Sequence, residues 1–171
     1  MNLWFRLVLA LLRIRFGRPR AITETGTVRF RVWPTDLDVN AHMNNGRYAT
    51  LMDLGRVDLM GRAGKLGAIR AARIYPVVTA QHILYRRSLA PFERFRLITR
   101  VIGSDERHAY MEQRFVRRRN GADELAARGI VQALFLRDAG GRVPMEEVRA
   151  LFELDDAMPV PGEIGAMFPP A

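Results

Sequence analysis

The sequence feature that most constrains the fold is a polar run, residues 36–48, placed between two patterned segments. Before it, residues 26–33 alternate apolar and basic side chains, which is typical of a strand with one buried face. After it, residues 48–60 are apolar over much of a helical circumference, and such a helix is expected inside a core. The chain therefore has to pack a strand and a buried helix against each other, with a polar segment at their junction.

The polar run concentrates groups that can take part in chemistry. From Asp36 to Asn45 it carries two carboxylates, three amides and one histidine. The start of a helix adds free backbone N–H groups and the positive end of the helix dipole. Carboxylates and histidine can act as acid, base or nucleophile. We therefore take this run as the candidate active site.

The rest of the chain is predicted to be mainly β-structure. Strands are expected over residues 77–89, 95–102, 109–118 and 125–136, and a short helix over residues 144–152. The pair Asn120-Gly121 favours a tight hairpin turn between the last two strands. The central helix is expected to end in the glycine-containing stretch 61–67. One buried helix with about five antiparallel strands predicts an α+β fold.

The two ends of the chain differ from its middle, so we divide it into a segment 1–20, a domain 21–154 and a tail 155–171. The first segment interleaves five arginines with apolar residues and has no acidic residue. Its apolar run is shorter than the roughly 20 residues that span a bilayer. Two interpretations stay open: a basic amphipathic helix on a membrane surface, or a helix packed on its own domain or on another subunit. The tail contains four prolines and is expected to be extended or poorly ordered.

Composition removes several classes of site and partner. The chain has no cysteine, which excludes disulfides, thiolate metal sites and cysteine nucleophiles. Its three histidines, 42, 82 and 108, are too scattered to predict a metal site. The net charge of +9 favours an anionic partner, such as coenzyme A phosphates, an acidic acyl carrier protein or an anionic membrane. Nucleic acid is not expected, because neither zinc-finger spacing nor an aromatic-basic RNA-binding signature is present.

The polar run also resembles a known family. Its pattern Asp-x-Asn-x-His-x-Asn-Asn-x-x-Tyr, from Asp38 to Tyr48, is similar to the active-site segment of hotdog-fold thioesterases. The resemblance extends to plant acyl-ACP thioesterases, to bacterial acyl-CoA thioesterases of the 4-hydroxybenzoyl-CoA thioesterase type, and to the thioesterase superfamily member 6 group. Asp53 and Arg56 have the spacing of an acidic-x-x-Arg pair often seen in the hotdog helix, and residues 84–87 resemble a strand of the plant enzymes.

The resemblance, over roughly residues 27–148, implies a fold, an activity and an assembly. The fold is the hotdog, a curved antiparallel sheet wrapped around a long central helix. The activity is hydrolysis of acyl-CoA or acyl-ACP thioesters, with no cofactor other than coenzyme A as part of the substrate. Hotdog active sites form between two subunits, so a homodimer or tetramer is expected. We expect a cytoplasmic protein of acyl or fatty acid metabolism, peripheral to the membrane if residues 1–20 bind it.

Within the run, the resemblance assigns catalysis to Asp38, Asn40 and His42. Asp38 matches the essential carboxylate, and both roles remain open for it: general base on water, or nucleophile. Asn40 and His42 match residues proposed to orient groups and handle protons. Asp36 is better explained by turn chemistry.

The helix start is expected to bind the substrate. The residues assigned to substrate binding are Asn44, Asn45, Gly46 and Tyr48. Asn44 is a suitable N-cap, and the backbone N–H groups near Asn45 and Gly46 are expected to stabilise the oxyanion. No metal is assigned.

One departure from the plant enzymes keeps alternatives open. The position that holds a catalytic Glu in those enzymes is Ser88 here, and the nearest acidic residue, Glu93, lies five residues further on. A non-catalytic acyl- or lipid-binding protein, or a membrane-associated scaffold, is therefore the alternative function. A hotdog enoyl-CoA hydratase ranks lower, because the spacing from Asp38 to His42 is one residue shorter than in the hydratase motif.

Overall fold

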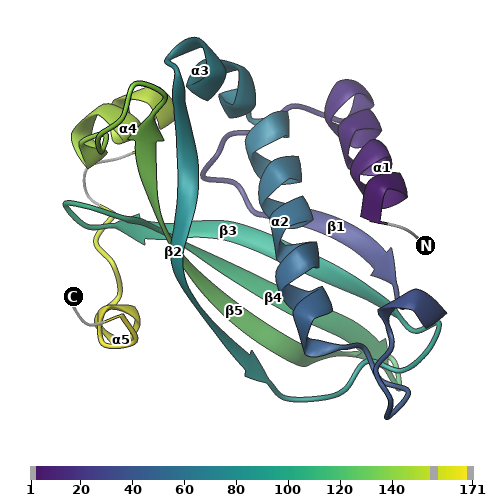
Figure 1. Cartoon of the computed structure of the whole chain (residues 1–171). Coiled ribbons are helices and arrows are strands. Elements are labelled where there is room, and N and C mark those ends of the chain that lie inside the picture. Colours follow the sequence, from purple (N-terminus) through teal and green to yellow (C-terminus); the bar gives the residue numbers. More distant parts are fainter. Residues whose placement is uncertain (1–2, 155–157, 169–171) are drawn as a thin grey trace.

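A computed structural model describes residues 3–154 and 158–168. A five-stranded antiparallel sheet curves around helix α2 (Asn45–Arg62), which lies across its concave face (Figure 1). The strands are β1 (Gly26–Arg31), β2 (Ile74–Tyr85), β3 (Arg94–Ser104), β4 (Ala109–Arg119) and β5 (Ala122–Arg137). The other helices are α1 (Leu3–Phe16), the 3-10 turn η1 (Pro34–Asp36), α3 (Lys65–Ala71), α4 (Met145–Phe152) and α5 (Gly162–Gly165). This is the arrangement that the resemblance to hotdog proteins predicts.

The strand order β1-β3-β4-β5-β2 leaves β1 and β2 as the two edges of the sheet. β3, β4 and β5 form a meander, and β2 pairs with β5 although it precedes β3 in the chain. The predicted hairpin between β4 and β5 is confirmed: Asn120 and Gly121 both have positive φ, 50° and 79°, as a type I′ turn requires. The edge strand β2 lies beside the start of α2, next to the polar run.

Helix α2 lies unusually close to the sheet at Gly55. A methyl group at this position would come within 2.8 Å of both Leu97 and Thr99 and within 2.9 Å of the Gln113 side chain. The buried Gln113 amide donates to the Met52 carbonyl oxygen at 2.8 Å and to Thr99 Oγ1 at 3.0 Å. Glycine and a satisfied buried amide therefore set the distance between helix and sheet.

Helix α2 ends within the glycine-containing stretch, as the sequence predicts, but not at the first glycine. The helix continues through Gly61 to Arg62, and Gly67 lies inside the following helix α3. Gly61 is accommodated because Ile14 of α1 fills the space that a side chain would occupy. The break falls at Gly64, which has a φ of 72° and precedes α3.

The sequence predicts an extended or poorly ordered tail, but part of the tail is helical. Residues Gly162–Gly165 form the short helix α5, and Ile164, 1% exposed, packs with Tyr110 and Ile130 on the outer side of the sheet. Parts of the predicted tail, residues 155–157 and 169–171, lie outside the described residues. A buried isoleucine in a proline-containing segment explains why composition alone misleads here.

Helix α1 docks on the domain through its basic side. Arg6, only 4% exposed, forms an ion pair with Asp36, and Arg13 bonds Asp58 at 3.2 Å. Both guanidinium groups also donate to backbone carbonyl oxygens of β1. The helix therefore points two arginines inward, and many of its apolar side chains face outward.

No helix among the described residues has both the length and the apolar character needed to cross a membrane.

Candidate active site

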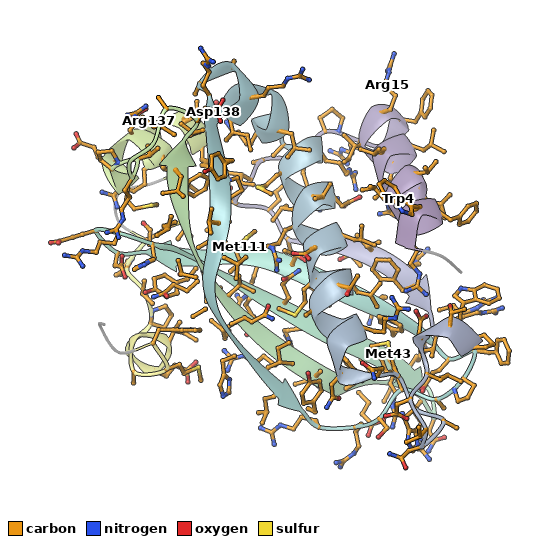
Figure 2. The ribbon with its side chains drawn as sticks, viewed as in Figure 1. Trp4, Arg15, Met43, Met111, Arg137 and Asp138 are labelled. Atoms are coloured by element: carbon orange, nitrogen blue, oxygen red, sulfur yellow. The ribbon has the colours of Figure 1, made fainter. Side chains whose placement is uncertain are left out.

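The polar run forms a narrow loop whose two ends meet at the start of α2. The Asn44 N–H donates to the Asp36 carbonyl oxygen at 2.8 Å, and Leu37 pairs with Met43 as an isolated antiparallel bridge. Near the tip, the Asp38 N–H donates to the His42 carbonyl oxygen at 2.9 Å. In Figure 2, Met43 marks the place where the loop returns to the foot of α2. These bonds bring the predicted catalytic residues into one short turn.

The base of this loop is buried and is stabilised by ion pairs of Asp36. The Asp36 carboxylate, 1% exposed, pairs with Arg6 and accepts the Trp33 N–H at 2.9 Å. Arg47 approaches its second oxygen at 3.7 Å. Asp36 thus performs the predicted turn chemistry, and it also anchors α1, which the sequence pattern did not indicate.

The tip of the loop is open to solvent. Asp38 Oδ1 accepts the backbone N–H groups of Asn40 at 2.9 Å and His42 at 3.2 Å, which fixes the carboxylate within its own turn. Asp38 Oδ2 makes no hydrogen bond with any described residue. The side chains of Asn40 and His42 are exposed, and within residues 3–154 and 158–168 no hydrogen bond joins them to Asp38 or to each other. The three predicted catalytic residues are neighbours, but the Asp38 carboxylate contacts the backbone N–H groups of Asn40 and His42 and not their side chains.

The start of α2 offers one free backbone donor rather than two. Asn44 is the N-cap, and its Oδ1 accepts the Gly46 N–H at 2.8 Å, as the sequence suggested for a cap. The Gly46 N–H is therefore already satisfied. The Asn45 N–H has no acceptor in the described part of the chain, and it lies at the positive end of the helix dipole. Of the predicted oxyanion donors, Asn45 is the one left available.

Tyr48 lies beneath the loop rather than on its surface. Its ring is 2% exposed and packs edge-on against Tyr85 and Phe115, with centroid distances of 5.0 and 4.8 Å. Burial, reinforced by the neighbouring Tyr85, raises the pKa of Tyr48 to about 12. The hydroxyl is therefore neutral at physiological pH.

Sequence reasoning missed Tyr85, which links the edge strand β2 to the helix start. Its hydroxyl donates to the Asn45 carbonyl oxygen at 3.4 Å, and its ring lies against Tyr48. The only sequence signal for it was its place in the stretch 84–87, which resembles a strand of plant thioesterases. Tyr85 is 41% exposed, so it is accessible beside the loop.

A shallow depression of about 390 Å³ separates α2 from β2. Ala49, Asp53 and Arg56 line it from one face of the helix, and residues 78–81 line it from the strand. The predicted ion pair between Asp53 and Arg56 is present, and Arg56 also donates to Gln113 Oε1 at 2.8 Å. Burial lowers the pKa of Arg56, although Asp53 opposes this shift. The depression therefore borders β2, an edge strand of the sheet.

Glu93 does not supply a free second acid in place of the carboxylate that Ser88 lacks. The Ser88 carbonyl oxygen accepts Arg117 Nη1 at 2.8 Å, and Glu93 pairs with the same arginine at 3.4 Å. Glu124 completes this group at 2.8 Å and raises the pKa of Arg117 by hydrogen bonding. Glu93 also accepts the Ala90 N–H at 2.8 Å, so it is engaged in holding the turn between β2 and β3.

Among the residues that the structure describes, no three His, Asp or Glu side chains gather as metal ligands would.

Comparisons with known proteins agree with this architecture. A model of the thioesterase-like superfamily matches residues 32–168. Protein THEM6 of Danio rerio is 42% identical over 111 residues, which cover 64% of this chain and 55% of that protein. Protein THEM6 of Drosophila melanogaster is 31% identical over 118 residues, covering 68% of this chain and 61% of that protein. The chain thus spans little more than half the length of these two relatives.

Two solved structures with similar folds carry the name thioesterase. The probable thioesterase YbaW of Escherichia coli has a TM-score of 0.69 at 20% identity, covering 75% of this chain and 96% of that one. A mutant of 4-hydroxybenzoyl CoA thioesterase, complexed with 4-hydroxybenzoyl CoA, has a TM-score of 0.67 at 11% identity, covering 74% and 97%. These likenesses establish the hotdog fold. Because the family model spans most of the chain, this protein belongs to the thioesterase-like superfamily.

Proposed function

We propose that this protein hydrolyses acyl thioesters of coenzyme A or acyl carrier protein, with Asp38 as general base or nucleophile. The observation that carries the proposal is the Asp38 carboxylate, which accepts two backbone N–H groups at the tip of an exposed loop and has one oxygen that no described residue binds. A thioester is a suitable substrate for such a site, because its carbonyl is electrophilic and thiolate is a good leaving group. Hydrolysis then needs an activated nucleophile and a donor for the oxyanion.

The residues around Asp38 would divide the remaining work. The Asn45 N–H and the positive end of α2 would stabilise the negative charge that develops on the thioester oxygen. His42 and Asn40 would orient water and move a proton toward the leaving thiolate. Asn44 would keep the helix start in place by capping it. Tyr48 and Tyr85 would support the same helix start from below.

Closure of the site would come from a second copy of the chain. β2 is a 12-residue edge strand, and Tyr75, Val78, Leu84 and Tyr85 on it are 41–44% exposed. A long apolar edge is a ready template for pairing with another strand. Pairing two β2 edges would extend the sheet across two subunits and cover the depression beside α2. We therefore propose a homodimer as the minimal active unit, and two such dimers could associate into a tetramer.

Charge near β2 suits a substrate with phosphate groups. Arg86 and Arg87 are exposed just beyond the end of β2. Arg87 forms an ion pair with Glu124, with 3.2 Å between Nε and Oε1. Arg117, by contrast, is buried and paired with Glu93 and Glu124, so it is not available. Arg86 would be the first cation to meet coenzyme A phosphates or an acidic carrier protein.

The test is a panel of short, medium, long and aromatic acyl-CoA thioesters, with release of free thiol as the readout. We expect release with at least one member, and its near loss in Asp38→Asn. No release from folded, dimeric protein across the panel would favour a non-catalytic acyl-binding protein, which is also what the engagement of Glu93 by Arg117 favours. Equilibrium binding of the same acyl-CoA compounds would then distinguish a binding protein from one with no affinity.

A further inference from the structure

Helix α1 presents an apolar surface to solvent. The side chains of this outer face are 41–78% exposed: Trp4, Phe5, Val8, Leu9, Leu11, Leu12 and Phe16. Because Arg6 and Arg13 turn inward to Asp36 and Asp58, the apolar side of the helix is the side left uncovered. The face runs along 14 residues, roughly 21 Å at the helical rise. A contiguous apolar face of this length on a folded domain indicates an interaction surface.

Arginines stand opposite one another on the neighbouring strands. In the register of β1 and β3, Arg29 lies opposite Arg96 and Arg31 lies opposite Arg94. Like charges directly across an antiparallel pair are unfavourable unless something neutralises them. Arg96 is paired with Asp123, whereas the guanidinium groups of Arg29, Arg31 and Arg94 have no carboxylate partner among the described residues. This part of the sheet therefore favours an anion.

The apolar face and the arginines border one groove. The groove has a volume of about 1280 Å³ between α1 and the β1 edge. On the helix side it is lined by Leu9, Leu12 and Phe16. On the strand side it is lined by Arg29, Arg31 and Arg94, the three arginines without a described carboxylate partner. Figure 2 shows Arg15 projecting from the far end of α1, away from the sheet. Apolar and cationic groups thus line the same groove.

We propose that α1 and the adjoining arginines Arg29, Arg31 and Arg94 form a surface that docks on an anionic membrane. The apolar face would enter the boundary between headgroups and acyl chains, and the arginines would meet lipid phosphates. A second copy of the chain is a poorer occupant. In a twofold contact through this surface the same arginines would face each other, and their charge would remain uncompensated.

This binding is separate from hydrolysis and is measured without a thioester. The probe is co-sedimentation of the full chain with vesicles of phosphatidylcholine, alone or mixed with phosphatidylglycerol, at low salt. We expect binding to the mixed vesicles that weakens as salt is added, and much weaker binding to phosphatidylcholine alone. Removal of residues 1–20 is a poor test, because it would leave Asp36 and Asp58 buried without their arginines.

Two variants separate the apolar and the cationic parts of the surface. Leu12→Glu, at a side chain that is 48% exposed, should weaken binding to the mixed vesicles about tenfold or more. The double variant Arg29→Gln with Arg94→Gln should weaken it by roughly fivefold for each arginine. Matched controls lie outside this surface, beyond the end of α5 and in the turn between β3 and β4: Met167→Glu for an exposed apolar residue and Arg107→Gln for an exposed cation. Both controls should bind like the original protein.

Three results would overturn the proposal. The first is no binding of the full chain to mixed vesicles at low salt, and the second is equal binding by the two surface variants and the two controls. The third is a fall in oligomer mass for Leu12→Glu in light scattering without vesicles, which would assign the face to a second copy. Thermal melting checks folding beforehand. If Leu12→Glu does not fold, the arginine double variant decides: loss of binding supports the membrane surface, and retention rejects it.

Discussion

Asp36 and Asp38 are two residues apart in one loop, and their surroundings are opposite. Asp36 is 1% exposed and is paired with Arg6, whereas Asp38 reaches solvent and is bonded only by N–H groups of its own turn. A buried carboxylate with a cation partner is committed to the fold, and removing one partner is strongly unfavourable. A carboxylate with one oxygen that no described residue binds is available for chemistry. Position in a motif does not separate these roles, but burial and partners do.

The difference between Asp36 and Asp38 is expected to be largest in the activity of the Asp38→Asn variant. The amide keeps an oxygen that can accept the N–H groups of Asn40 and His42, so the loop should keep its shape. It cannot act as a base or nucleophile, and loss of general-base help lowers the rate by roughly 10²–10⁴-fold. We expect that fall in kcat/KM for the best thioester of the panel, with an unchanged melting temperature. Unchanged turnover would remove Asp38 from the mechanism.

Asp36→Asn should affect stability before activity. Breaking a buried ion pair by changing one partner costs about 3–5 kcal/mol, because Arg6 remains as an uncompensated buried charge. Urea denaturation of Asp36→Asn, of Arg6→Gln and of the double variant would measure this. The double variant should lose less than the sum of the single losses, since the pair is removed together. Additive losses would mean that Asp36 and Arg6 stabilise the protein independently.

Asn40→Ala and His42→Ala should have smaller effects than Asp38→Asn. Neither side chain has a hydrogen-bond partner in the described part of the chain, so both should leave the free energy of unfolding nearly unchanged. Loss of one hydrogen bond to a charged transition state corresponds to roughly 10- to 100-fold in rate. Single-turnover kinetics would measure this loss. A larger effect than that of Asp38→Asn would make His42 or Asn40 the principal catalytic group.

The smallest effect at neutral pH is expected for Tyr48→Phe. The hydroxyl is neutral there and the ring supplies the packing, so KM and stability should change little. At alkaline pH the original protein should lose stability as pH rises from about 10 toward the raised pKa of about 12, because the unfolded tyrosine ionises first. The Phe variant should lack that part of the alkaline loss. A large rise in KM at neutral pH would instead support direct substrate binding by this hydroxyl.

Short-range sequence patterns correctly predicted the strands, the central helix and one hairpin turn. Alternation located the strands, the apolar helix was found within a few residues, and the Asn120-Gly121 pair gave the hairpin. The loop of the candidate site was recognised from its motif. Its likeness to known proteins also gave the fold, which periodicity alone left open.

The features that were missed depend on partners far away in the sequence. The inward turn of α1 depends on Asp36 and Asp58, which follow Arg6 and Arg13 by 30 and 45 residues. Tyr85 reaches the helix start from an edge strand 40 residues away. No pattern within a short window carries this information.

The close contact at Gly55 has a mechanical consequence. Leu97, Thr99 and Gln113 form a fixed floor beneath it, and Gln113 is itself bound to the helix at Met52. A helix is stiff over this length, so lifting it at position 55 would also tilt its first turn at Asn45, about 15 Å away. A single methyl group at position 55 would thus displace the start of α2, and with it the Asn45 backbone N–H of the candidate site.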